Sequence, residues 1–166
     1  MNKARAFLAA CVLQDQYVYA FGGLSDYLIL NTIEKYDIIT DTWISLYFKL
    51  PIPLAKLAAV ATDSKHIYIL GGMSADYEPS SKVWQLDVPL AKFKDKNPMK
   101  YERLVEGGQG AFRAHNGNIF CLNGCLDQYE CERYKPAKDA WEMLPSFETV
   151  TNRESLNPYV GALVRE

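Results

Sequence analysis

The stretch "YVYAFGG", Tyr17 to Gly23, is a strand-like run of aromatic and aliphatic residues that ends on two glycines. Nearly the same run returns as "IYILGG", ending at Gly72, and as "IFCLNG", ending at Gly124. The distance from Gly23 to Gly72 is 49 residues, and from Gly72 to Gly124 it is 52. A period near fifty residues is typical of a modular fold. The sequence therefore predicts three copies of one structural unit.

Each unit also contains two residues seven positions apart, downstream of its glycines. The unit divides into four short strands: a small-residue strand, the glycine-ended strand, a strand with a tyrosine and a strand with a tryptophan. No helical stripe is present. In the second unit the aromatic pair is replaced by weaker residues, so we expect looser packing there. The three pairs are Tyr36 and Trp43, Leu86 and Phe93, and Tyr134 and Trp141.

The doubled glycines predict backbone with positive φ and a close approach of neighbouring chain, which a Cβ would block. We expect the rings of Tyr36 and Trp43 to cover this bare backbone, since each buries a large area. The glycines of the motif are Gly22, Gly23, Gly71, Gly72 and Gly124.

Together these features resemble the kelch repeat of β-propellers. The repeat is marked by a doubled glycine, then Tyr-Asp (Tyr36-Asp37), then a tryptophan six or seven residues later. The third unit departs from it, with Asn123 for the first glycine and Lys135 for the aspartate. The resemblance covers roughly residues 5–145.

The resemblance implies an all-β fold: a kelch-type propeller of about three four-stranded blades plus the first strand of a fourth. Because propellers usually close with four to eight blades, we expect an incomplete ring. Further blades of a longer chain, other subunits or a larger assembly would complete it, and we favour a longer chain. The predicted segment is 1–166, with blade 1 at 5–50, blade 2 and a long connection at 51–106, blade 3 at 107–147, and a tail at 148–166.

The composition limits the class of protein. With 49% hydrophobic residues the chain can bury a core, and 18 basic against 20 acidic side chains give a net charge of −2. No basic field favours nucleic acid or a membrane surface. The four cysteines lack disulfide-framework or zinc spacing, which favours a reducing, cytoplasmic location, with cytoskeletal or ciliary sites as further options.

Metal-dependent catalysis is the alternative from another class, because some kelch-like propellers are copper oxidases of the galactose oxidase type. Both His66 and His115 fall in predicted turns, so copper is disfavoured. Cys121, Cys125 and Cys131 could be grouped with His115 as a zinc site, but Cys121 lies at a core position of its strand. We therefore expect no enzyme, catalytic residue, metal or cofactor, unless the chain is a fragment of an enzyme whose site lies in missing blades.

Loops after the glycines are the candidate binding surface. Each contains an acidic residue and a tyrosine, and the repeat places all three loops at one rim. Rigid tyrosines are enriched at interface hot spots, although the same tyrosines could instead pack on the next loop. The resemblance implies a non-enzymatic protein–protein scaffold or adaptor, such as a ubiquitin-ligase adaptor or a cytoskeletal or ciliary scaffold. The candidate partner-binding residues are Asp26, Tyr27, Asp76, Tyr77, Asp127 and Tyr129.

Overall fold

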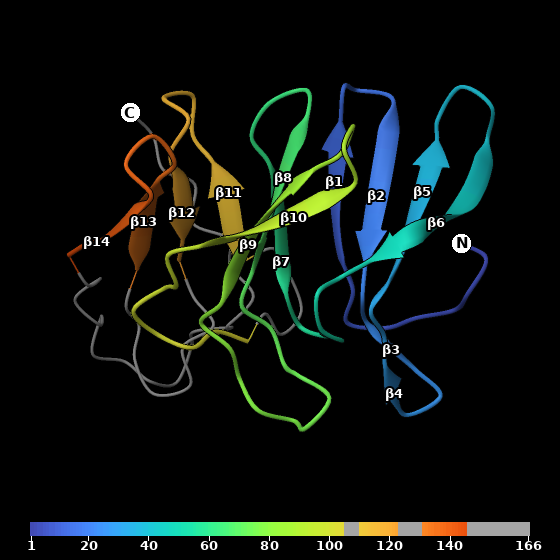
Figure 1. Ribbon diagram of the computed structural model, residues 1–166, viewed down its shortest axis with the longest axis horizontal. Coiled ribbons are helices and arrows are strands. Elements are labelled where there is room, and N and C mark those ends of the chain that lie inside the picture. The colour runs from blue at the N-terminus through green and yellow to red at the C-terminus, as the bar shows by residue number, and fades with distance from the viewer. Residues whose placement is uncertain (105–109, 123–130, 146–166) are drawn as a thin grey trace, which may run out of the picture.

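The computed structural model describes residues 1–104, 110–122 and 131–145. Within these ranges every regular element is a β-strand, and the strands form three four-stranded antiparallel sheets and one small hairpin (Figure 1). None of these residues forms a helix that could cross a membrane. The three sheets stand side by side as an arc that does not close into a ring. The predicted all-β fold of four-stranded blades is confirmed.

Each blade is a meander in which the strands follow one another in chain order. The exact boundaries between blades, and the tail at 148–166, stay predictions. Blade 1 contains β1 (Ala9–Leu13), β2 (Tyr17–Phe21), β5 (Thr32–Asp37) and β6 (Thr42–Lys49), with the hairpin β3 (Leu24–Ser25) and β4 (Leu28–Ile29) between β2 and β5. Blade 2 contains β7 (Ala58–Ala61), β8 (His66–Leu70), β9 (Val83–Asp87) and β10 (Lys92–Lys96). Blade 3 contains β11 (Ala111–Arg113), β12 (Ile119–Cys121), β13 (Glu132–Lys135) and β14 (Ala140–Met143).

The seven-residue spacing comes from the hairpin that joins the last two strands of each blade. The two residues of each pair are directly opposite one another across that hairpin. Four turn residues separate the flanking strands in all three blades: 38–41, 88–91 and 136–139. The spacing is therefore set by the strand register and the turn length. For this reason it is also present in blade 2, which has no Tyr–Trp pair.

The last residue of this turn has positive φ in every blade. In blade 1 it is Asp41, which accepts a 2.5 Å hydrogen bond from the Tyr36 hydroxyl. In blade 3 it is Asp139, which accepts the same bond from Tyr134 at 2.5 Å. In blade 2 both hydrogen-bonding partners are absent: Leu86 stands in place of the tyrosine and Ala91 in place of the aspartate.

Blade 2 is the centre of the core because both of its faces are covered. Along β8, Ile67 and Ile69 face blade 1, whereas Tyr68 and Leu70 face blade 3, and all four are at most 2% exposed. The first strands of adjacent blades, β1, β7 and β11, lie next to one another. The interface of blades 1 and 2 includes Cys11, Tyr19, Phe21, Ile33, Ala59, Trp84 and Leu86, and that of blades 2 and 3 includes Val60, Val83, Ala111, Ile119, Cys121 and Tyr134.

The glycine pairs have the predicted positive φ, 58° and 95° at Gly22 and Gly23 and nearly the same values in blade 2. The prediction that aromatic rings cover them was wrong. A Cβ at Gly22 would lie 2.1 Å from the carbonyl oxygen of Leu54, in the connection that enters the next blade. Tyr36 lies farther along its sheet, opposite Val18, with its ring 5.1 Å from that of Trp43.

Gly71 repeats this arrangement, with the Arg103 carbonyl oxygen 2.8 Å from the site of a Cβ. Gly22 and Gly71 therefore make room for the chain entering the next blade, and Gly23 and Gly72 for the chain entering their own blade. The Tyr–Trp pair stabilises the hairpin instead. Gly124 lies outside the described residues.

Candidate functional site

The hairpin β3–β4 presents one tyrosine almost completely to solvent. Ser25 pairs with Leu28, so the turn contains only Asp26 and Tyr27, with φ of 48° and 65°. Positive φ at both central residues is the type I′ geometry that suits a two-residue hairpin. Tyr27 is 91% exposed. From the sequence this segment was expected only to be a loop, and neither turn residue is the glycine that is usual in such a hairpin.

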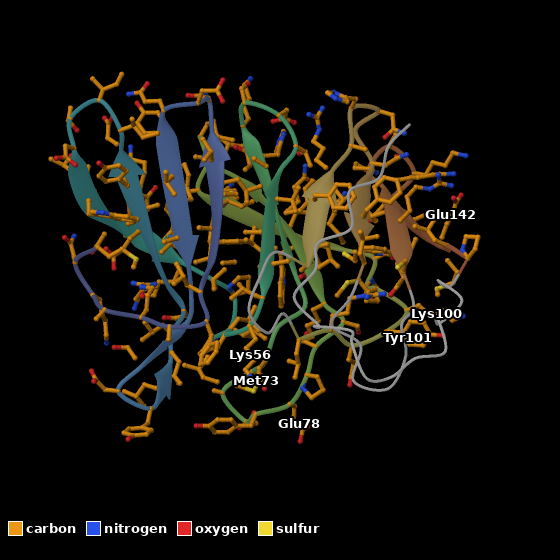
Figure 2. All side chains as sticks on the ribbon, turned by 180° about the vertical axis from the view of Figure 1, so that it is seen from behind. Lys56, Met73, Glu78, Lys100, Tyr101 and Glu142 are labelled. Atoms are coloured by element: carbon orange, nitrogen blue, oxygen red, sulfur yellow. The ribbon has the colours of Figure 1, made fainter. Side chains whose placement is uncertain are left out.

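The equivalent loop of blade 2 is closed by its own backbone. The N–H of Ser74 donates to the Glu78 carbonyl at 2.9 Å, and the N–H of Tyr77 donates to the Ser74 carbonyl at 3.0 Å. Tyr77 has φ of 63° and is 62% exposed, and Asp76 beside it is exposed. Figure 2 shows Met73 and Glu78 of this loop at the lower edge of the molecule, the edge from which β3–β4 projects in Figure 1.

We call the β3–β4 hairpin and the 73–79 loop the rim. Of the candidate residues, Asp26, Tyr27, Asp76 and Tyr77 lie on its surface, and neither tyrosine hydroxyl is hydrogen-bonded within the described part of the chain. This exposure disfavours the alternative in which the two tyrosines are packing residues. Their role in binding stays a prediction. Asp127 and Tyr129 lie outside the described residues.

A buried arginine–glutamate cluster that the sequence analysis missed lies in blade 1. The Arg5 Nη2 lies 2.6 Å from the Glu34 Oε1, and both side chains are 1% exposed. The backbone N–H groups of Asn2 and Lys3 donate to the same carboxylate at 2.6 and 3.1 Å. Burial alone would raise the pKa of Glu34, but the bonds from Asn2, Lys3 and Arg5 outweigh it and lower the pKa.

The same cluster is built in blade 3. Arg103 and Glu132 are 2.8 Å apart and buried, and the carboxylate accepts backbone N–H bonds from Lys100 at 2.8 Å and Tyr101 at 3.3 Å. Figure 2 labels Lys100 and Tyr101 beside blade 3. The clusters are 98 residues apart, the separation that also relates Tyr36 to Tyr134. That common offset is the sequence signal that could have revealed them.

The histidines show no catalytic arrangement. The Nδ1 of His66 is 2.8 Å from the Asp63 carboxylate and its Nε2 is 3.8 Å from that of Asp87. Burial would raise the pKa of Asp63, but bonds from His66 and from backbone N–H groups lower it. His115 is exposed on a turn. No group of three or more His, Cys, Asp or Glu side chains that could hold a metal occurs among residues 1–104, 110–122 and 131–145.

The cysteines of the described residues, Cys11, Cys121 and Cys131, are buried. Cys121 is 2% exposed in the core, as predicted for its strand position. Burial raises the pKa of the Cys11 thiol to about 12, so it is not a nucleophile at neutral pH. Cys131 donates to the Leu122 carbonyl at 3.3 Å. Cys125 lies outside the described residues.

The Kelch motif family model matches residues 5–46, which contain the glycine pair, Tyr36 and Trp43 of blade 1. The chain is a kelch-repeat protein. An F-box/kelch-repeat protein of Arabidopsis thaliana is 32% identical to it over 108 residues, which is 63% of this chain and 39% of that protein. Kelch-like protein 35 of Mus musculus is 27% identical over 143 residues, which is 85% of this kelch-repeat protein and 23% of the mouse one. The matched regions thus span well under half of either relative.

Proposed function

We propose that this kelch-repeat protein is a non-enzymatic scaffold or adaptor that binds a partner protein at the rim. The observation that carries the proposal is the exposure of Tyr27 and Tyr77, 91% and 62%, on turns whose backbones are fixed by hydrogen bonds. A tyrosine held in this way contributes contact area with little loss of conformational entropy on binding. Kelch-repeat proteins generally bind protein partners, which supports the same conclusion.

The charges of the rim indicate the chemistry of the partner surface. Asp26, Asp76 and Glu78 are exposed next to the two tyrosines. Lys56 is a positive charge near Met73 of the rim (Figure 2), and its ammonium lies 5.5 Å from the centre of the Phe7 ring. We expect a partner with basic groups around an apolar or aromatic centre, because such a surface complements both the carboxylates and the rings.

We also propose that further blades or other subunits cover the outer face of blade 1. Tyr134 in blade 3 is fully buried, with its ring 5.6 Å from that of Tyr68 in blade 2. Its equivalent in blade 1, Tyr36, is only partly buried. A neighbouring blade would supply the missing contact. The buried, free thiol of Cys11 supports a reducing compartment, and we propose a cytoplasmic location.

The test compares a rim variant with a matched surface variant. Tyr27→Ala combined with Tyr77→Ala removes both rim rings, whereas Tyr47→Ala removes a ring that is 87% exposed on the outer strand β6. Quantitative mass spectrometry of crosslinked proteins identifies partners lost with the first variant and kept with the second. Calorimetry with the purified partner then measures the affinity. We expect the rim variant to bind at least about tenfold more weakly, with an unchanged melting temperature.

Two results would contradict the proposal. The first is a partner that binds the rim variant and the wild type equally well. The second is a rim variant that melts like a damaged core, because the tyrosines would then be packing residues rather than a binding surface.

A further inference from the structure

Blade 2 lacks the arginine–glutamate cluster, and its chain differs at every contributing position. Gly23 donates its N–H to the Leu54 carbonyl at 2.8 Å, as Gly72 donates to the Arg103 carbonyl at 2.8 Å. These bonds make Leu54 the equivalent of Arg103 and Pro51 the equivalent of Lys100. Pro51 has no N–H to donate. The equivalent of the glutamate is Trp84, two residues before Leu86.

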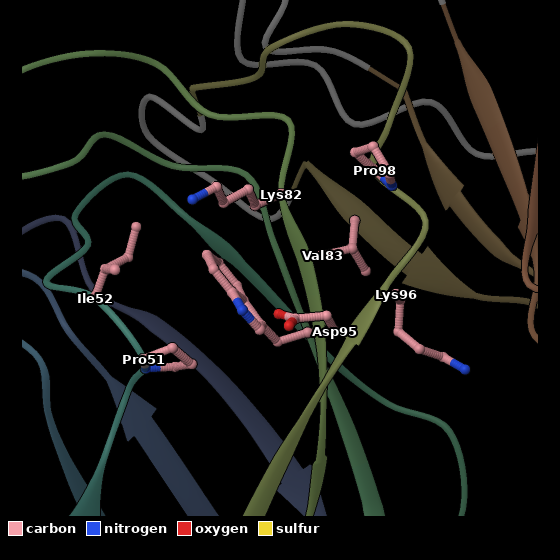
Figure 3. Close-up of a pocket in the computed structure, with 8 residues that line it drawn as sticks. Pro51, Ile52, Lys82, Val83, Asp95, Lys96 and Pro98 are labelled. Carbon is pink, nitrogen blue, oxygen red and sulfur yellow. The ribbon is translucent and has the colours of Figure 1, made fainter.

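A depression of about 370 Å³ opens where the cluster would lie (Figure 3). It lies between the connection from blade 1 and the outer strands of blade 2. In Figure 3 the Asp95 side chain points toward Pro51 and Ile52, whereas Lys96 points away from them. The residues that line it are Pro51, Ile52, Lys82, Val83, Trp84, Asp95, Lys96 and Pro98.

The depression contains an unpaired hydrogen-bond donor. Trp84 is only 4% exposed, and no described residue accepts a hydrogen bond from its indole N–H. Trp84 lines the depression, and its indole nitrogen is not fully enclosed by protein atoms. By contrast, the indole N–H of Trp141 donates to the Asn97 carbonyl at 2.9 Å. A buried indole N–H usually finds a partner.

An unpaired acceptor lies on the strand next to Trp84. Asp95 is directly opposite Trp84 in the β9–β10 register, so the two side chains lie on the same face of the sheet. Its carboxylate is exposed and forms no hydrogen bond or ion pair with any described residue. Lys96, the next residue, lies 3.7 Å from Asp139 instead. Lys82 is exposed at the edge of the depression.

We propose that this depression binds an extended peptide segment of a partner protein. An amide presents an oxygen that can accept from Trp84 and an N–H that can donate to Asp95. Pro51, Ile52 and Pro98 offer apolar contact to a side chain of the segment, and Lys82 attracts an acidic residue next to it. In blades 1 and 3 a carboxylate on this face of the sheet accepts N–H groups of a peptide backbone, and Asp95 offers a carboxylate for the same contact, which favours a peptide over another kind of ligand. The site is separate from the rim.

The test uses the full ¹⁵N-labelled chain and the blocked peptide acetyl-Ala-Leu-Glu-Ala-amide. The chain has three tryptophans, so its three indole N–H signals can be assigned with single Trp→Phe variants. We expect the Trp84 signal to shift saturably with peptide up to about 5 mM, a range that detects even weak binding. The Trp43 signal, from blade 1, should stay in place.

Two variants identify the contacts. Asp95→Ala should weaken binding about tenfold, because it removes a hydrogen bond to a charged acceptor. Glu102→Ala, another exposed acid that does not line the depression, should leave the affinity unchanged. A peptide with an ester in place of the Leu–Glu amide lacks the N–H donor and should bind about as weakly to the wild type as the amide binds to Asp95→Ala.

The proposal is overturned by either of two results: a Trp84 signal that does not move, or a shift that Asp95→Ala leaves intact. The first result comes from the wild-type chain and the second from a variant of an exposed residue, so neither depends on a variant that fails to fold. Loss of binding at the rim would not change them, because neither Tyr27 nor Tyr77 lines the depression.

Discussion

Blades 1 and 3 differ from blade 2 by whole interacting pairs rather than by single residues. The Tyr–Asp pair of the hairpin is present in both outer blades and becomes Leu86 with Ala91 in blade 2. The arginine–glutamate cluster is likewise present in both and becomes Leu54 with Trp84. Losing one member of a buried polar pair leaves an unsatisfied group, whereas replacing both can be nearly neutral. At each of these paired positions a blade thus has two polar residues or two apolar residues, and no blade combines one of each.

The two interfaces of blade 2 are consequently of different kinds. The interface with blade 1 is apolar at Leu54 and Trp84, both at most 4% exposed. The interface with blade 3 contains the ion pair of Arg103 and Glu132. A buried ion pair stabilises little relative to well-packed apolar residues, yet breaking it is costly. The difference predicts where single substitutions do most damage.

The largest effect is expected from Glu132→Ala. The substitution removes the acceptor of Arg103 and of two backbone N–H groups, and it leaves a buried charge without its carboxylate. We expect a loss of about 3–5 kcal/mol in the free energy of unfolding, measured by guanidinium denaturation. A loss below about 1 kcal/mol would mean that the cluster is not a closed buried unit.

The double variant Arg103→Leu with Glu132→Trp is the control, because it gives blade 3 the apolar residue pair that blade 2 has at Leu54 and Trp84. We expect it to recover most of the stability that Glu132→Ala loses. If it is less stable than Glu132→Ala, the comparison between the blades does not hold.

Next in size is Gly22→Ala, which tests a feature that blades 1 and 2 share. The added Cβ would lie 2.1 Å from the Leu54 carbonyl oxygen, at a φ of 58°. Strain and overpacking together should cost about 3 kcal/mol, measured by thermal and chemical unfolding. Gly117→Ala is the matched control, since Gly117 also has positive φ but has open space around it, and about 1 kcal/mol is expected. Equal losses would contradict the close approach at Gly22.

A smaller effect is expected from Tyr134→Phe. The hydroxyl donates to Asp139 inside a fully buried ring contact, so its loss should cost about 1–2 kcal/mol. Tyr36→Phe removes the equivalent bond to Asp41 at an exposed hairpin and should cost less than Tyr134→Phe. Chemical denaturation of the two variants side by side gives the difference. A larger loss for Tyr36→Phe would indicate that blade 1 is covered in solution.

The smallest expected effect is a pH dependence from Glu34. Its pKa is lowered in the folded protein, so its stabilising contribution is present above its ordinary pKa of 4.5. The contribution is lost as the pH falls below that value and through the lowered folded pKa. The free energy of unfolding of the wild type should therefore exceed that of Glu34→Gln at neutral pH, and the difference should disappear between about pH 5 and pH 2. Denaturation at several pH values measures it. If this difference in the free energy of unfolding stays unchanged in acid, the stabilisation does not come from an ionised Glu34.

Much of the fold could be predicted because its signals are local. The spacing of Tyr36 and Trp43 reflects one hairpin, and positive φ at Gly22 is a property of the residue itself. What fills the space beside the glycine could not be predicted in this way. The Leu54 carbonyl comes from the chain entering the next blade, 32 residues later, and no local pattern indicates that contact.

The candidate site shows the same division. The loops with Tyr27 and Tyr77 were found from the repeat, but the turn geometry that exposes Tyr27 was not, because Asp-Tyr is an unusual type I′ pair. The depression in blade 2 could not be predicted at all. It results from residues that blade 2 lacks, and that absence is visible only beside the clusters of Arg5 and Arg103.

Each interface of blade 2 contains one native thiol, Cys11 on the side of blade 1 and Cys121 on the side of blade 3. Both are buried. Alkylating reagents reach such thiols only when the two sheets separate, so labelling rates at the two positions report the separation of each pair of blades. Alkylation of Cys11 and Cys121 in one sample therefore compares how fast the apolar interface and the ionic interface open.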